Sequence, residues 1–176
     1  MGKIDLRKDA KKFRRELNKT VKSLAKSTEP ISALEFGYDC DQGGWIFIHA
    51  DRRPQHDRDG QWTVDLDDDN TIEMPHWIEA IDANFEGEEI QLTKFDGTKL
   101  VIPGFDSEDA PHDEEEDGGP IVVAIGEMIH DVVMSAKTEG LFADLGKPGT
   151  IQLDIEDFNG GWGWPEYDDL GKTNLA

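Results

Sequence analysis

The first apolar pattern in the chain has the period of an α-helix. Apolar side chains recur at intervals of three and four, at Leu6, Ala10, Phe13, Leu17, Val21 and Leu24. This spacing places them on one face of a helix, and most positions between them are charged. Pro30 disfavours helix in the residue before it, so the segment is predicted to end there. We assign residues 1–28 to a basic amphipathic helix.

This helix has two interpretations. In the first, its apolar stripe packs on the rest of the domain and its charged face is exposed. In the second, it is an external arm that binds nucleic acid or a membrane. Because burying each large apolar side chain stabilises a protein by about 1.5–3 kcal/mol, docking on the domain is favoured.

Two stretches further on have the composition of β-strands. Residues 31–38 and 45–50 are rich in aromatic and β-branched side chains, and the sequence DCDQGG separates them as a turn. The apolar residues at 45–48 are consecutive, which indicates a strand covered on both faces. A third strand is predicted at 62–66, where Trp62, Val64 and Leu66 alternate with polar residues.

Proline residues mark the start of two further helices. Pro75 suits a first helical position, and the apolar face of that short helix is Trp77, Ile78, Ile81 and Phe85. Pro120 in the same way begins a longer helix that Gly140 ends. Its apolar stripe is Ile121, Ile125, Met128, Ile129, Val132 and Val133.

A hairpin and a last strand complete the predicted elements. Apolar runs at 90–95 and 100–102 flank Asp96-Gly97, a dipeptide that favours a type I′ hairpin turn. Alternating apolar residues at 151–155 predict a strand with one solvated face. The predicted order is α-β-β-β-α-β-β-α-β, which indicates a single α+β domain over residues 1–176. It would have three helices and a mainly antiparallel sheet of about five to six strands.

Charge is distributed unevenly along this chain. The 176 residues carry a formal charge of −21, yet residues 1–26 contain ten Lys and Arg against three carboxylates. That segment is therefore +7 and the other 150 residues are −28. An acidic body of this kind repels nucleic acid and anionic lipid and attracts basic proteins. We expect a basic protein as the partner, no nucleic acid on the acidic body, and no membrane.

The negative charge is most concentrated at 104–119. This stretch holds eight carboxylates and no Lys or Arg, and its glycines and prolines favour an irregular, solvated loop. Together with the acidic turn at 67–69 and the aromatic end of the chain, it makes up the predicted partner-binding surface. The residues of that surface are Asp106, Glu108, Asp109, Asp113, Glu114, Glu115, Glu116, Asp117, Asp67, Asp68, Asp69, Trp162 and Trp164.

Residues 159–176 are predicted to be an irregular C-terminal tail. Its glycines are not those of a phosphate-binding loop, because no Lys follows them and the acidic sequence PEYDD would repel phosphate. Trp162 and Trp164 suit either of two roles. They are anchors of a protein interface, or they cap one edge of the sheet.

No metal site or cofactor is predicted from local motifs. Residues 65–76 place aspartates at the first, third and fifth positions of a calcium loop, but Asn70 replaces the turn glycine and His76 the final Glu. Consecutive carboxylates at 114–117 point to alternate sides of an extended chain and do not converge. A metal site assembled from residues far apart in the sequence stays open.

Other reactive residue types have structural interpretations. Cys40 lies between Asp39 and Asp41, whose charge disfavours a thiolate, so we interpret it as a turn residue. The five histidines form no HExxH motif and no close pair with Cys40, and are interpreted as hydrogen-bonded structural residues.

The cellular compartment is inferred from the same composition. One cysteine cannot form an internal disulfide, no run of 18 apolar residues occurs, and no apolar stretch follows the basic start as in a secretory signal. A cytoplasmic location is therefore predicted. Acidity can also keep a protein soluble in high salt, but the Lys-rich first helix argues against that origin.

Two stretches carry a resemblance to a known class of protein. The hairpin ALEFGYDCDQGGWIFIHAD and the later EMPHWIEAID, in a small acidic chain with an opening helix, resemble bacterial immunity proteins. Those proteins neutralise polymorphic or contact-dependent toxins, often basic nucleases, by covering the toxin's site. The resemblance spans residues 30–85 and assigns no individual site residue. It implies a stoichiometric inhibitor.

The leading hypothesis is an acidic cytoplasmic protein-binding module, an immunity-type inhibitor of a basic toxin, with no enzyme activity. Two alternatives stay open. A carboxylate-based or metal-dependent hydrolase requires a cleft in which carboxyl groups have strongly shifted pKa values. A DNA-mimic protein requires carboxylates spaced like phosphates along one ridge.

Overall fold

The computed structural model describes residues 2–40, 42–54, 57, 63–64, 71–104, 119–146, 151–159 and 163–164. These residues form three helices and eight strands. In chain order they are β1 (Gly2–Asp5), α1 (Leu6–Leu24), β2 (Ala33–Asp39), β3 (Trp45–Asp51), β4 (Thr71–Glu73), α2 (Pro75–Phe85), β5 (Ile90–Thr93), β6 (Lys99–Ile102), α3 (Gly119–Thr138), β7 (Gln152–Asp157) and β8 (Gly163–Trp164). The predicted α+β class is confirmed, and the predicted order is found with β1 and β8 added to it.

The strands form two mixed sheets. The larger has the order β4-β3-β2-β7-β8 and the smaller the order β1-β5-β6. Most neighbouring strands are antiparallel, but β2 with β7 and β1 with β5 are parallel. Both parallel pairs join strands that are far apart in the sequence, so local patterns alone did not reveal the second sheet.

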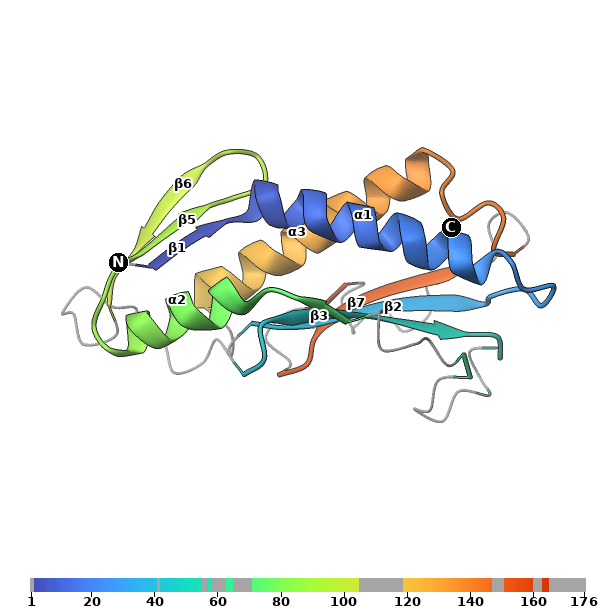
Figure 1. Cartoon of the computed structure of the whole chain (residues 1–176), viewed down its shortest axis with the longest axis horizontal. Helices are drawn as coiled ribbons and strands as arrows, with labels where there is room; N and C mark the ends of the chain where they lie inside the picture. The colour runs from blue at the N-terminus through green and yellow to red at the C-terminus, as the bar shows by residue number, and fades with distance from the viewer. Residues whose placement is uncertain are drawn as a thin grey trace.

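Helices α1 and α3 lie on the same face of the larger sheet (Figure 1). The side chains that face them alternate along the strands, with Leu34, Phe36 and Tyr38 on β2 and Leu153 and Ile155 on β7 all buried. The Tyr38 hydroxyl donates a hydrogen bond of 2.9 Å to the Val122 carbonyl oxygen of α3. The core therefore lies between this sheet face and the two long helices.

Helix α1 buries the stripe that its sequence predicts, which supports the docked interpretation. Leu6, Phe13 and Leu17 are fully buried, and the rings of Phe13 and Phe36 meet edge to face at 6.0 Å. Asp5 begins the helix, because its side chain accepts a hydrogen bond from the Arg7 backbone N–H. Residues 2–5, which the sequence assigned to the helix, form β1 instead.

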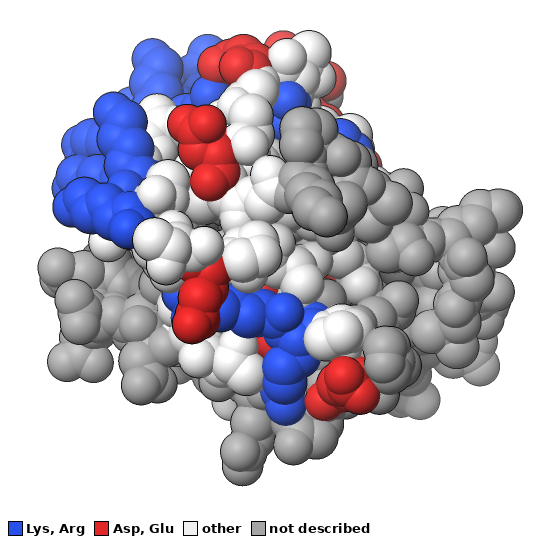
Figure 2. Space-filling view, turned by 90° about the vertical axis from the view of Figure 1, so that its right-hand side faces the viewer, with Lys and Arg blue, Asp and Glu red and all other residues white. Residues whose placement is uncertain are grey.

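The opposite side of α1 is basic and exposed. Figure 2 looks at the end of the molecule where α1 ends and shows Lys and Arg side chains gathered at its upper left, over α1. The exposed cations are spaced by three or four positions and share one side of the helix. We call them the basic face of α1: Lys8, Lys11, Arg15, Lys19, Lys22 and, in the turn after the helix, Lys26.

The β5–β6 hairpin is confirmed, but its predicted turn type is wrong. The Gly97 N–H donates to the Lys94 carbonyl oxygen, and the Lys94 N–H to the Thr98 carbonyl oxygen. Gly97 has a φ of 92°, whereas no described residue other than glycine has a positive φ. A type I′ turn needs positive φ at both central residues, so Asp96 rules it out. The contacts fit a three-residue loop that ends in a left-handed glycine.

Two further local predictions differ from the structure. Within the strand predicted at 62–66, the structure describes residues 63–64, and they are not in a strand. The strand that pairs with β3 on that side is β4. Cys40 lies in the bend directly after β2, as predicted, but it is also buried among core side chains, so it is a core residue as well.

Helix α3 is long and apolar enough to cross a bilayer by length and composition alone. Half of that window is buried inside the domain, including Ile125, Ile129 and Val133. Burial of this kind is typical of the core helix of a globular domain, and α3 packs against α1 and β7.

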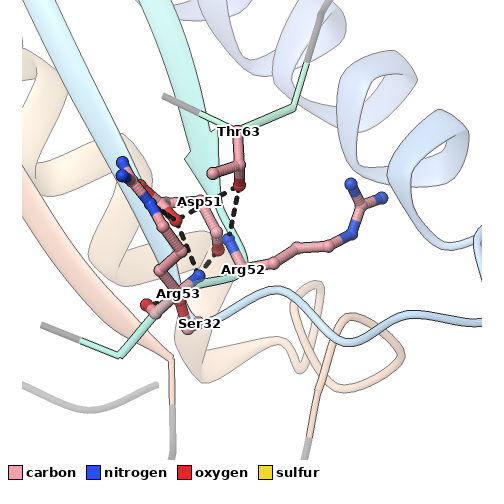
Figure 3. A network of polar contacts seen from close by, with 5 residues as sticks. All are labelled: Ser32, Asp51, Arg52, Arg53 and Thr63. Carbon is pink, nitrogen blue, oxygen red and sulfur yellow. Dashed lines mark hydrogen bonds and ion pairs between the residues drawn. The ribbon is translucent and has the colours of Figure 1, made fainter. Parts of the chain in front are cut away.

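A network of polar contacts around the buried Asp51 lies at the end of β3 (Figure 3). The Asp51 carboxylate accepts hydrogen bonds from the Arg53 backbone N–H at 2.7 Å and from the Arg53 guanidinium at 2.9 Å. The Thr63 hydroxyl lies 3.2 Å from the same carboxylate, and the Ser32 hydroxyl donates to the Asp51 carbonyl oxygen. These contacts join the end of β3 to the residue before β2.

Candidate partner-binding site

Only one residue of the predicted partner-binding surface lies within the described part of the chain. The eight carboxylates of 106–117, the three of 67–69 and Trp162 lie outside the described residues. Trp164 is half-buried on β8, at the edge of the larger sheet. The assignment of the other residues therefore stays a prediction.

Trp164 lies on the side of the sheet that faces α3. It pairs with Ile155 of β7, whose side chain is in the core, and it packs against the core cluster. Its ring centre is 5.0 Å from that of His130 on α3. This position fits the prediction that a tryptophan of the tail caps a sheet edge, and the same side chain also lines a cavity.

The cavity has a volume of about 480 Å³ and lies between the β5–β6 turn, α3 and β8. Small-molecule sites in proteins typically have volumes of about 300–1,000 Å³. We call it the acidic cavity. Its described lining is Lys94, Phe95, Asp96, Ala124, Glu127, Met128, His130, Asp131 and Trp164.

The sequence of α3 explains why acidic and apolar groups meet here. Ala124, Glu127, Met128 and Asp131 follow the spacing of one helix side, so they form a single row. Ala124 and Met128 are buried, whereas Glu127 and Asp131 are exposed. The row therefore has an apolar floor and a charged rim. Opposite it, the turn at Gly97 presents Phe95 and Asp96.

Aromatic rings form part of the cavity walls. Phe95 is 41% exposed although it is a large apolar side chain. Trp164 and His130 meet with an angle of 64° between their ring planes. Exposed aromatic groups beside carboxylates can bind a cation through the ring face and the charge together.

The electrostatics of the acidic cavity are dominated by carboxylates. Lys94 forms an ion pair of 2.7 Å with Glu127, and this hydrogen bond raises the pKa of Lys94. The backbone N–H of Thr98, with its side chain, lowers the pKa of Asp96. Asp131 lies 3.4 Å from Nδ1 of His130. With three carboxylates and one Lys, the described lining carries a net charge of −2 when His130 is neutral.

The groups of this lining suit the binding of a cation. Lys94 is already paired with Glu127, so the carboxylates outnumber the cations among the described lining residues. An organic cation could place its charge beside Glu127 and Asp131 and its carbon atoms against Phe95 and Trp164. The cavity therefore favours an ammonium or guanidinium ligand.

Most residues of the acidic cavity were not predicted from the sequence. Glu127, His130 and Asp131 are polar positions on an otherwise apolar helix, and that break in the pattern was the available signal. Nothing local indicates that the turn at Phe95 lies beside them. The cavity depends on contacts between three elements that are distant in the sequence.

A second aromatic cluster lies on the other face of the larger sheet. Trp45, Phe47 and His49 alternate along β3, and the ring of Phe158 lies 4.9 Å from Trp45 and 5.9 Å from Phe47. His49 also lies 3.4 Å from a carboxylate oxygen of Glu35. We call these four side chains the outer aromatic cluster. They shield one another, which accounts for the consecutive apolar residues of this strand.

The remaining candidates are the histidines, a metal site and the calcium-like stretch, and only some of their residues lie in the described part of the chain. The three described histidines each lie within hydrogen-bonding distance of a carboxylate. No group of three His, Cys, Asp or Glu within the described ranges could hold a metal ion. The calcium-like stretch lies outside the described residues except for its last six positions.

Comparisons with protein-family models, with curated proteins and with solved structures find no match to this chain.

Proposed function

We propose that this protein binds a basic protein, and that the acidic cavity receives a lysine or arginine side chain of that partner. The observation that carries the proposal is the convergence of three carboxylates and two aromatic side chains on one cavity. A guanidinium is weakly hydrated, stacks on aromatic rings and pairs with carboxylates through a planar set of donors. Arginine is therefore the better fit of the two.

The charge of the rest of the chain supports the same partner. Residues 106–117 carry eight carboxylates and directly precede α3 in the sequence. Complementary charge of this size speeds association and suppresses binding of acidic competitors. The most specific form of the proposal is a cytoplasmic immunity-type inhibitor that forms a one-to-one complex with a basic toxin. No contact among the described residues favours the hydrolase or the DNA-mimic alternative.

Short charged peptides test the binding step directly. We expect hexa-arginine to bind the full chain and quench Trp fluorescence, hexa-lysine to bind more weakly, and hexa-glutamate not to bind. Combining Glu127→Gln with Asp131→Asn should weaken hexa-arginine binding by roughly tenfold, which corresponds to about 1.4 kcal/mol. Raising NaCl from 50 to 300 mM should weaken binding further, because the contacts are charge-assisted.

A matched variant controls for the change in net charge. Glu79→Gln with Asp82→Asn removes the same two charges from the exposed side of α2, and it should leave affinity within about twofold of the wild type. Equal losses of affinity in both double variants would mean that the acidic cavity is not the site.

The immunity form of the proposal is tested by inhibition. A basic toxin captured from the source cells should lose its activity at one equivalent of wild-type protein. Full inhibition by the Glu127 and Asp131 double variant at 300 mM NaCl would contradict that form.

A further inference from the structure

A second cavity differs from the acidic cavity in having several basic side chains in its lining. It has a volume of about 410 Å³ and is formed by β1, the first turn of α1, the start of α2 and β5. The groups that matter in its lining are Lys3, Lys8, His76, Gln91 and Thr93. Three of them are basic side chains, although the chain as a whole carries −21. We call it the basic cavity.

The imidazole of His76 is held in place at this cavity by a buried carboxylate. Asp9 is 4% exposed, and one of its oxygens accepts a hydrogen bond of 2.9 Å from Nε1 of Trp77. The same oxygen lies 3.0 Å from Nε2 of His76. With Nε2 facing Asp9, Nδ1 is the ring nitrogen available to a ligand. A side chain held on one side by a buried group is pre-organised to bind on the other.

Two carboxylates also line this cavity, but each has its own partner. Asp5 forms a two-pronged ion pair with Arg7, with both distances 2.9 Å. The hydrogen bond from Arg7 lowers the pKa of Asp5, and Lys8 contributes to the same effect. Asp9 is held by Trp77 and His76. Lys3 and Lys8 balance Asp5 and Asp9 in the lining itself, and Arg7, which pairs with Asp5 from outside the lining, brings the region to one positive charge in excess with His76 counted as neutral.

Lys3 and Lys8 are the cations that a ligand would meet. Both are exposed, and neither forms an ion pair with another described residue. The strand register places Lys3 beside Gln91 and Asp5 beside Thr93, so an amide and a hydroxyl lie next to the charged groups. Ammonium groups with neutral hydrogen-bond donors are the chemistry that recognises a phosphate group.

We propose that the basic cavity binds a small phosphate monoester, with Lys3, Lys8 and His76 around the phosphate group. The rest of the chain argues for a small ligand over a nucleic acid. Residues beyond the first 26 carry −28, so a long polyanion would meet strong repulsion outside the cavity. A mononucleotide fits a cavity of this volume and keeps its charge within it. This inference is independent of the proposed partner, since it concerns another cavity and the opposite charge.

Calorimetric titration of the full chain with inorganic phosphate and with adenosine monophosphate tests this proposal. We expect saturable binding of both, tighter for the nucleotide. Lys3→Gln combined with Lys8→Gln should weaken binding about tenfold, and His76→Gln should weaken it severalfold. Lys22→Gln with Lys26→Gln, at the far end of α1, removes equal charge and should leave affinity unchanged.

Three results would overturn the proposal. One is the absence of saturation up to 10 mM of either probe. Another is an equal loss of affinity in the two lysine double variants, which would indicate general attraction to α1. The third is tighter binding of a 20-nucleotide single strand than of the mononucleotide, which would make the site part of a nucleic-acid surface. Circular dichroism of each variant shows whether it is folded, so a loss of binding is not confused with unfolding.

Discussion

Asp51 shows how a single buried carboxylate fixes the end of a strand. It is 1% exposed and accepts hydrogen bonds from the backbone and side chain of Arg53 (Figure 3). Burial raises the pKa of Asp51, but the Arg53 N–H, its guanidinium and the Thr63 hydroxyl together lower it below its usual value of 3.8. The carboxylate is therefore stabilised in its charged form despite its burial.

We predict that Asp51→Asn destabilises the protein by about 2–4 kcal/mol at pH 7. The amide leaves the partly buried Arg53 guanidinium without its counter-charge, and losing one partner of a buried pair typically costs about 3–5 kcal/mol. The side chain of Arg53 is 25% exposed, which reduces that figure. Urea denaturation measures the difference, and Asp82→Asn on the exposed side of α2 should change stability by less than about 0.5 kcal/mol.

The pH dependence of this difference has a definite sign. Because the folded-state pKa of Asp51 is lowered, its contribution is present above the unfolded pKa near 3.8 and is lost as pH falls through the lower folded value. The two proteins should therefore differ fully at pH 6, and the difference should shrink as pH falls below the unfolded pKa of about 3.8. A difference that stays constant from pH 6 to pH 3 would show that the ion pair is not its source.

At the scale of elements, Gly37 explains how Phe158, the residue after β7, reaches the side chains of β3 across β2. A Cβ atom on Gly37 would lie 2.5 Å from Cε2 of Phe158, so only glycine leaves room for that ring over β2. The Phe158 N–H donates to the Tyr38 carbonyl oxygen at 2.9 Å, which fixes the start of the turn after β7. The ring can then reach Trp45 and Phe47 on β3.

Gly37→Ala is expected to destabilise the protein by about 1–2 kcal/mol. The methyl group would displace Phe158 and disturb its ring contacts with Trp45, Phe47 and His49. Contacts of this kind are worth about 0.5–1.5 kcal/mol each. In an open strand the same change would stabilise by roughly 0.4–1 kcal/mol, because alanine has less freedom than glycine in the unfolded chain. A loss of stability would therefore indicate that the methyl group displaces Phe158, whereas a gain would indicate that it does not.

A double-mutant cycle measured by urea denaturation separates these two effects. In a Phe158→Ala background, Gly37→Ala should become neutral or stabilising. If it destabilises the protein equally with and without the Phe158 ring, the explanation through Phe158 is wrong, and the backbone of β2 itself must resist the substitution.

The same elements show which features a sequence can reveal. The stripe of α1, the limits of α3 and the hairpin at Gly97 follow from local periodicity and turn chemistry, and all three are found. Strand β1 was missed because Ile4 is its single large apolar residue and its partner, β5, follows 85 residues or more later. The acidic cavity was missed for the same reason. Lys94, Glu127 and Trp164 meet only through long-range packing.

Two differences between the predicted and the observed local conformation also have physical causes. Asp96-Gly97 favours a type I′ turn in isolation, but the register of β5 with β6 leaves three residues in the loop. The glycines around Trp164 favour an irregular tail, yet pairing with β7 places this residue in a strand. In both places tertiary pairing decided between conformations that the local sequence allows.

For the whole molecule, the separation of charge is the dominant property. The basic face of α1 is exposed on one side, as Figure 2 shows, and two other cations of α1 contact neighbouring parts of the chain. Arg14 pairs with Glu139 near the end of α3, and Lys12 donates to the Glu73 carbonyl oxygen. These contacts tie the basic helix to the acidic body. The chain nevertheless keeps 39 carboxylates against 18 Lys and Arg.

We therefore predict that salt stabilises this protein. At 0.01 M ionic strength the screening length is about 30 Å, so most carboxylates repel one another, whereas at 1 M it is about 3 Å. Salt also weakens exposed ion pairs such as Arg15 with Glu16, but such pairs contribute only about 0–1 kcal/mol each. The relief of repulsion should exceed that loss. Raising NaCl from 10 mM to 1 M should increase Tm by about 5 °C or more, which corresponds to roughly 2 kcal/mol.

A variant in which the eight carboxylates of 106–117 become amides identifies the source of this effect. It carries a net charge of −13 instead of −21, so it should melt at a higher temperature than the wild type in 10 mM NaCl. In 1 M NaCl the two proteins should melt together, because screening removes the repulsion that distinguishes them. A Tm difference that persists at high salt would point to a specific contact made by these residues, and an absence of any difference at low salt would mean that their charge does not act on folding. Thermal unfolding followed by circular dichroism distinguishes the three outcomes. If the two curves converge as expected, the acidic segment lowers stability when the protein is alone, and a basic partner would stabilise the complex by relieving that repulsion.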